Sequence, residues 1–127
     1  MERRLDVAAA EWWWGGAVAD GEASPLGRYA HRRNLATSSG ALQDDALGAN
    51  QSAPLLVSSQ GRYIWSERPF TFAFDGAGHL DLVGDDLVVA ESGGGLADAF
   101  RAAARRFFPA TGGAPDRRMF AAPQYNT

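Results

Sequence analysis

The sequence predicts a mostly β protein, an antiparallel β-sandwich with one α-helix near its C-terminal end. Three observations predict this fold class. Apolar and polar residues alternate through the middle of the chain, and short turn signals separate the alternating runs. After Gly95 the period of the apolar residues changes to that of a helix. With 127 residues, of which 46% are hydrophobic, the chain is long enough to bury the core of one domain.

The N-terminal part predicts a strand, a turn and a second strand. Residues 5–18 carry a short apolar segment and three consecutive tryptophans, and Asp20-Gly21 follows as a turn signal. From Ala23 to Ala53 the periodicity disappears and Gly, Ser, Asn, Asp and Ala dominate. This composition predicts a long irregular stretch, and loops of that length are usually functional or mobile.

The middle of the chain predicts a series of short strands. Apolar or alternating runs occupy residues 55–57, 62–65, 70–74, 79–83 and 87–89. Two glycine-containing turns, Ser59-Gln60-Gly61 and Asp75-Gly76-Ala77-Gly78, lie between runs of this series. Short strands at this spacing are typical of an antiparallel sandwich, in which one face of each strand is buried.

The helix is indicated by four apolar residues at positions i, i+4, i+7 and i+11, which are Leu96, Phe100, Ala103 and Phe107. Asp98 lies in its first turn and two arginines lie in its last, as the helix dipole favours. Pro109 ends it, and a loop leads to a last segment that begins at Met119.

Composition and charge exclude several classes of function. The chain has 12 basic and 15 acidic side chains, a net charge of −3, so we expect no nucleic-acid partner. It contains no lysine, which excludes a P-loop and a Schiff base, and no cysteine, which excludes a thiolate nucleophile. No signal peptide and no apolar run of membrane-spanning length is present, so we expect a cytoplasmic protein without a membrane partner.

No complete catalytic constellation is predicted from spacing. The pairs Asp44-Asp45 and Asp85-Asp86 are poor acid–base candidates, because neighbours on a strand point to opposite faces, and both pairs are expected to be solvated turn residues. His31 and His79 lack the spacing of metal ligands, so we expect no bound metal and no cofactor. The run Ser92-Gly93-Gly94-Gly95 lacks phosphate-binding spacing and is interpreted as a connection into the helix.

The three tryptophans leave two interpretations open. Alternation places Trp12 and Trp14 on one face of a strand and Trp13 on the other. Either both faces are covered by the protein itself, or one tryptophan faces a carbohydrate or another domain, since an indole can stack on a sugar ring.

Four blocks, in the same order along the chain, resemble the N-terminal domain of glycoside hydrolase family 31. The longest is NQSAPLLVSSQGRYIWSE at residues 50–67, followed by Pro69-Phe70. The segment WWGGAV at 13–18 is similar to the start of that domain. The segment LADAF at 96–100 resembles its linking helix, and FAAPQYNT at 120–127 resembles the entry to the first strand of the catalytic barrel.

The resemblance implies a galactose-mutarotase-like β-sandwich at 1–95, a linking helix and loop at 96–118, and the first residues of a (β/α)₈ barrel at 119–127. Such enzymes are retaining α-glycosidases, in which one aspartate attacks the sugar and another serves as acid and base. Both catalytic aspartates are expected beyond Thr127, so the 127 residues are expected to be a non-catalytic fragment. The implied partners are the barrel of the same polypeptide and an α-glycoside substrate.

The resemblance also implies a rim loop over Asn34 to Gln51 at the mouth of the sugar pocket. The candidate substrate-binding residues are Trp14, Asn50, Gln51 and Asn126. For Asn50 and Gln51 the alternative is an amide pair that braces the loop backbone. For the whole chain, the alternatives are a free-standing carbohydrate-binding module that uses Trp13 or Trp14, and a structural domain without a ligand.

Overall fold

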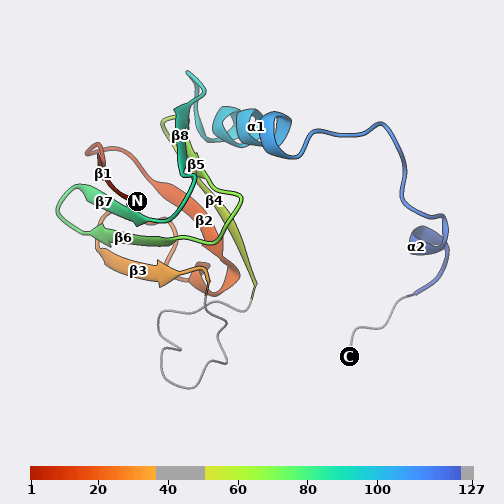
Figure 1. Cartoon of the computed structure of the whole chain (residues 1–127), viewed down its shortest axis with the longest axis horizontal. Coiled ribbons are helices and arrows are strands. Elements are labelled where there is room, and N and C mark those ends of the chain that lie inside the picture. The colour runs from red at the N-terminus through yellow and green to blue at the C-terminus, as the bar shows by residue number, and fades with distance from the viewer. Residues whose placement is uncertain (37–50, 124–127) are drawn as a thin grey trace.

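In a computed structural model, which describes residues 1–36 and 51–123, the chain folds as two antiparallel four-stranded sheets with helices (Figure 1). Sheet A has the strand order β1 (Glu2–Asp6), β7 (His79–Val83), β6 (Thr71–Asp75) and β3 (Ala30–Asn34). Sheet B has the order β2 (Trp13–Ala17), β4 (Ser52–Ser58), β5 (Arg62–Trp65) and β8 (Val88–Glu91). The helices are the 3₁₀ helix η1 (Val18–Asp20), α1 (Leu96–Phe107) and α2 (Arg118–Ala121).

The main core lies between the two sheets, as expected for a β-sandwich. Alternate side chains of the strands point into it, and seven of them are Trp13, Leu56, Ile64, Phe72, Phe74, Leu80 and Leu82. Each is at most 2% exposed, and burying a side chain of this size contributes about 1.5–3 kcal/mol. The period-two runs of the sequence are therefore confirmed as half-buried strands.

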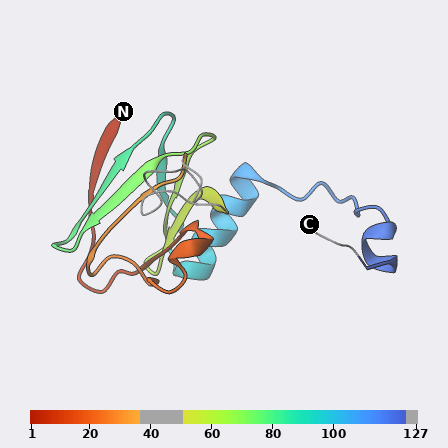
Figure 2. The same ribbon diagram turned by 90° about the horizontal axis from the view of Figure 1, so that it is seen from below.

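Helix α1 packs on the outer face of sheet B over β4 and β5, so this part of the sheet is covered on both sides (Figure 2). Ala99 and Ala103 are fully buried against Val57 and Tyr63, because alanine lets the helix approach the strands closely. Phe107 stacks on Trp65 with ring centroids 5.0 Å apart. The predicted helix is confirmed, and its N-terminal turn is closed by the Gly95 N–H, which donates to the Asp98 carboxylate at 3.0 Å.

The face of α1 that is buried differs from the predicted apolar stripe at its N-terminal half. Leu96 and Phe100 are 37% and 52% exposed, whereas the small Ala99 contacts the sheet. The helical period alone does not predict which face of α1 is buried, because alanine and the larger apolar residues all count as apolar in it. The shape of the sheet surface decides which of them pack against the strands.

Strand β3 lies where the sequence predicted an irregular stretch, so that prediction is wrong for residues 30–34. The segment Ala-His-Arg-Arg-Asn has no alternation of apolar and polar residues. It is a strand because its backbone pairs with β6 at the edge of sheet A. Pairing of the backbone at an edge leaves little trace in the side-chain pattern.

The chain leaves the sandwich after Phe108, whose ring lies 5.6 Å from that of Trp65 in β5. Every residue from 108 to 123 is exposed, and Figure 1 shows this segment running away from the sheets to α2. Residues 118–121, which fall in and next to the block resembling the entry to a barrel strand, form a single helical turn. No helix in the described ranges is long and apolar enough to cross a bilayer.

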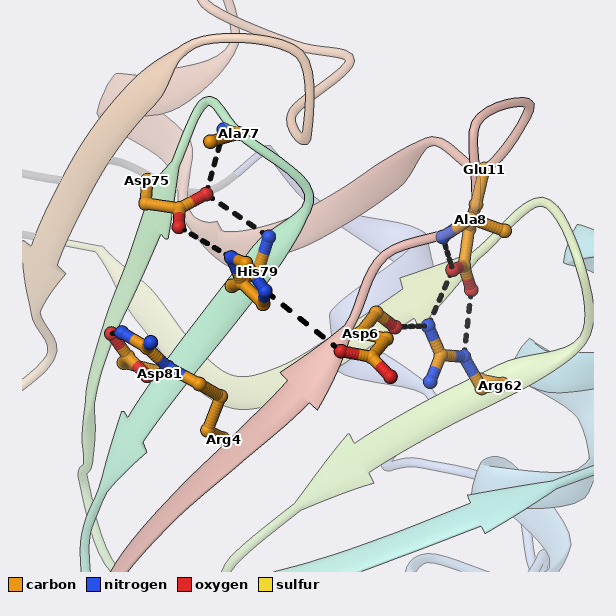
Figure 3. Close-up of polar contacts among 9 residues, drawn as sticks. All are labelled: Arg4, Asp6, Ala8, Glu11, Arg62, Asp75, Ala77, His79 and Asp81. Atoms are coloured by element: carbon orange, nitrogen blue, oxygen red, sulfur yellow. Dashed lines mark hydrogen bonds and ion pairs between the residues drawn. The ribbon is translucent and has the colours of Figure 1, made fainter.

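Ion pairs fasten strand β1 and the loop after it to the rest of the sandwich (Figure 3). Arg4 of β1 donates two hydrogen bonds to Asp81 of β7, at 2.6 and 2.7 Å. Asp75 accepts from the backbone N–H groups of Ala77 and His79, at 2.7 and 3.0 Å, and its other oxygen lies 2.7 Å from the His79 ring. These hydrogen bonds lower the pKa of Asp75 to about 2.

We expect the free energy of unfolding to fall as the pH is lowered from about 5 to about 2. A carboxyl whose pKa is depressed in the folded state stabilises it above the unfolded pKa, and that stabilisation is lost as the pH falls through the folded pKa. Asp75 has an ordinary pKa of 3.8 and Asp81 is also lowered, chiefly by its hydrogen bonds from Arg4. Urea denaturation at a series of pH values measures the loss.

The control for this prediction is Asp75→Asn, which keeps an acceptor for both backbone N–H groups and removes the titration. The variant should lose less stability than the parent between pH 4 and pH 2, values chosen to bracket the expected transition. Equal losses in both proteins would show that Asp75 does not contribute.

Candidate functional site

A groove lies on the outer face of sheet B, between η1 and α1. Its volume is about 580 Å³, and it is open to solvent. Trp14, Leu55 and Val57 form its apolar side on the sheet, and Phe100 closes it on the side of α1. Gln51, Ser52 and Ser24 supply polar groups along it. A volume of this size is typical of sites for small ligands.

Two glycines of β2 shape the floor of the groove. Gly15 has φ +115°, and a Cβ at this position would lie 2.3 Å from the Leu55 carbonyl oxygen. Gly16 has φ +78°, and a Cβ there would lie 2.9 Å from the Phe72 ring. The register between β2 and β4 shifts between Gly15 and Ala17, as in a β-bulge. Only glycine meets both requirements, a positive φ and close approach of neighbouring atoms.

The wall formed by η1 is held by hydrogen bonds and by a buried carboxylate. The Val18 N–H donates to the Gln51 carbonyl at 2.9 Å. Asp20 is 2% exposed, is paired with Arg33 of β3 and lies 3.0 Å from the His31 ring. The Asp20 carbonyl also accepts from the N–H and hydroxyl of Ser24, each at 3.0 Å. One side of the groove is therefore anchored to sheet A.

Of the predicted substrate-binding residues, the structure brings Trp14 and Gln51 together at this groove. Asn50 and Asn126, and most of the predicted rim loop, lie outside the described residues. Gln51 is exposed, and its backbone carbonyl rather than its amide is used to brace η1. Sequence reasoning missed Phe100 as a wall of the site, although Phe100 stood in the helical stripe.

Trp13 and Trp14 lie on opposite faces of β2, as alternation predicted, whereas Trp12 precedes the strand. Trp13 is fully buried in the core, where its ring lies 6.5 Å from that of Phe74. The alternative in which Trp13 stacks on a sugar is therefore wrong, because no surface of this side chain reaches solvent. Trp14 is partly exposed, and Trp12 lies under the guanidinium of Arg28, 4.3 Å from its ring centroid.

The carboxylates of the described residues do not assemble into an acid–base pair at the groove. Asp85 and Asp86 lie in the turn between β7 and β8, and the Asp85 side chain is 69% exposed, as expected. Asp44-Asp45 lies outside the described residues. The buried carboxylates, Glu11 and Asp20, are each paired with an arginine. Within these ranges no three His, Asp or Glu side chains are placed to hold a metal ion.

Glu11 illustrates what such pairing does to a carboxylate. Burial alone would raise the pKa of Glu11, but hydrogen bonds from Arg62, Ser58 and the Ala8 N–H outweigh it and lower the pKa. Glu11 therefore stays ionised at neutral pH and does not act as a general acid. Among the described residues, the side chains that line the groove are uncharged. Comparison with models of known protein families and with curated proteins gives no match for this chain.

Proposed function

We propose that this domain is the non-catalytic N-terminal β-sandwich, of the galactose-mutarotase-like type, of a retaining α-glycosidase. In this role it supports a (β/α)₈ barrel of the same polypeptide and helps to shape the mouth of the sugar pocket. The four blocks that resemble glycoside hydrolase family 31 support the proposal. So does the order of elements, two antiparallel sheets followed by a helix packed on one of them.

The observation that carries the proposal is a set of large apolar side chains that the domain leaves exposed on α1 and on the segment after it. They are Leu96, Phe100, Phe108, Met119 and Phe120, between 37% and 75% exposed. They lie along α1 and the segment after it, and large apolar residues left exposed in this way favour a surface that a partner covers. A barrel that follows in the same polypeptide would cover such residues.

The chemistry of the proposed enzyme requires two carboxyl groups about 5–5.5 Å apart across the scissile bond. In the proposal both come from the C-terminal ends of barrel strands, the usual position of active sites in that fold. Glu11 and Asp20 do not take these roles, since each is buried and neutralised by arginine. The sandwich thus contributes binding surface and rigidity to the enzyme.

The proposal is tested by comparing the 127-residue chain with the product of the coding sequence extended past Thr127. The extended protein should hydrolyse an aryl α-glycoside with retention of anomeric configuration, and the purified 127-residue chain should not. Hydrolysis by the chain alone, or an extension that encodes no barrel, would refute the proposal.

A pair of matched variants tests the apolar surface itself. Phe100→Glu in the extended protein should lower its thermal stability, because a charge is buried against the barrel. Thr111→Glu, on the exposed segment after α1, should not. If both variants behave like the parent protein, α1 does not face the barrel.

A further inference from the structure

We infer that the groove between η1 and α1 is a binding site for an uncharged sugar, in which a pyranose ring lies against Trp14 and its hydroxyls bond Gln51 and Ser52. This goes beyond the proposed function, because it gives the sandwich a ligand of its own. It does not depend on a barrel.

The charge of the groove restricts the ligand. Among the described residues, every side chain that lines it is uncharged, in a chain where 21% of residues are charged. A charged ligand would lose part of its hydration in the groove and find no opposite charge there, which costs free energy. A neutral ligand has no such penalty.

The polar groups in the groove favour a sugar over an apolar protein segment. The Trp14 indole N–H, the Gln51 amide and the Ser52 hydroxyl make no hydrogen bond within the described residues. An apolar segment laid over them would leave these donors and acceptors without water and without partners. Sugar hydroxyls would satisfy them.

The apolar surface of the groove fits the other side of a pyranose. Trp14 is partly exposed there, and Leu55 and Val57 extend the apolar surface beside it. The C–H face of a sugar ring stacks on an aromatic face of this kind, while the hydroxyls at the ring edge reach polar groups. An apolar cleft with a few convergent polar groups is the usual form of a small-ligand site.

The side chains that surround the groove hold it in a preformed shape. Gly15 and Gly16 let β2 lie close to β4 and to the core beneath the groove, and the buried Asp20–Arg33 pair anchors the opposite wall. A preformed site loses little conformational entropy when a ligand binds. This matters for sugars, because they bind weakly and cannot offset a large entropy cost.

The test is a titration of the ¹⁵N-labelled 127-residue chain with maltotriose and with cellotriose, followed by NMR. The chain has four tryptophans, so the indole N–H signal of Trp14 can be assigned by substitution. We expect saturable shifts of the Trp14 indole and the Gln51 amide with at least one of the two sugars. The Trp12 signal, outside the groove, should not move.

Variants of Trp14 and Trp12, and an uncharged apolar peptide, test whether the sugar binds in the groove. Trp14→Ala should abolish the saturable shifts of Gln51, whereas Trp12→Ala should retain them. If Trp14→Ala does not fold, Gln51→Ala decides, because Gln51 is exposed and its side chain makes no bond within the described residues. The inference is overturned if neither sugar moves the Trp14 signal, or if an uncharged apolar peptide moves it and the sugars do not. Either negative result leaves the glycosidase proposal standing.

Discussion

Replacing Arg62 with methionine should lower the free energy of unfolding by about 3–5 kcal/mol, the usual cost of leaving one member of a buried ion pair unpaired. The Arg62 Nε donates to Glu11 at 2.8 Å, and a second guanidinium nitrogen bonds the other carboxylate oxygen. The Glu11 side chain is 1% exposed. In Arg62→Met its negative charge would stay buried with only the Ala8 N–H and Ser58 beside it.

Arg62 also joins parts of the chain that are far apart in sequence. It belongs to β5 of sheet B, and it donates to the Asp6 carbonyl of β1 in sheet A at 2.6 Å (Figure 3). Its guanidinium lies 5.2 Å from the centre of the buried Trp13 ring. Its loss therefore removes a link between the two sheets in addition to the pairing of Glu11.

The matched control is Arg4→Met, the same substitution in an exposed ion pair. Arg4 and Asp81 are 61% and 41% exposed, and solvent screens such a pair, so this variant should lose far less stability than Arg62→Met. Urea denaturation at neutral pH compares the two variants.

The double variant Glu11→Gln, Arg62→Met should be more stable than Arg62→Met alone, because it removes the buried charge. Equal losses in Arg62→Met and Arg4→Met would contradict the prediction.

A chain ending at Gly95 should fail to fold, whereas a chain ending at Phe108 should be as stable as the full chain within about 0.5 kcal/mol. Removing α1 exposes the outer face of sheet B, including Val57 and Tyr63, which are 9% and 5% exposed under the helix. Each such side chain contributes about 1.5–3 kcal/mol when buried, and domains of this size are stable by only about 5–15 kcal/mol. Thermal denaturation followed by circular dichroism measures the effect.

This experiment also tests the domain boundary after residue 95 that the family resemblance implies. If the chain ending at Gly95 unfolds cooperatively at the same temperature as the longer one, α1 is a linker and the boundary stands. A milder pair of variants gives the same information in the full chain. Ala103→Asp places a charge in the buried contact with sheet B and should destabilise strongly, and Ala97→Asp on the exposed face should not.

Regular strands of the sandwich could be predicted from the sequence because their side chains carry the pattern of burial. Arg62–Trp65 and His79–Val83 were predicted with the bounds that the structure gives, since each is half-buried or more. Strand β3 was missed because its position at the edge of sheet A is specified by backbone pairing with β6. Arg33 of β3 is buried, but an arginine is expected at the surface when only the sequence is considered. Its burial is explained by the ion pair with Asp20, which only the structure shows.

The candidate site could be predicted only in part. The sequence predicts both Trp14 and Gln51 as binding residues. They are 37 positions apart in the chain, however, and the sequence does not indicate that they lie in one groove. Phe100 joins them from a third element, α1. Which of the tryptophans faces the groove depends on which face of β2 meets sheet A.

By itself the sequence determined the class of fold, the positions of most strands and of α1, and the exclusion of lysine and cysteine chemistry. Those properties depend on residue identity and on local period, which are present in any single stretch of chain. Only the tertiary structure decided that Trp13 is core, that Leu96 and Phe100 stay exposed, and that Glu11 and Asp20 are neutralised by distant arginines. Burial and pairing are properties of two segments in contact, and a one-dimensional pattern does not record which segments meet.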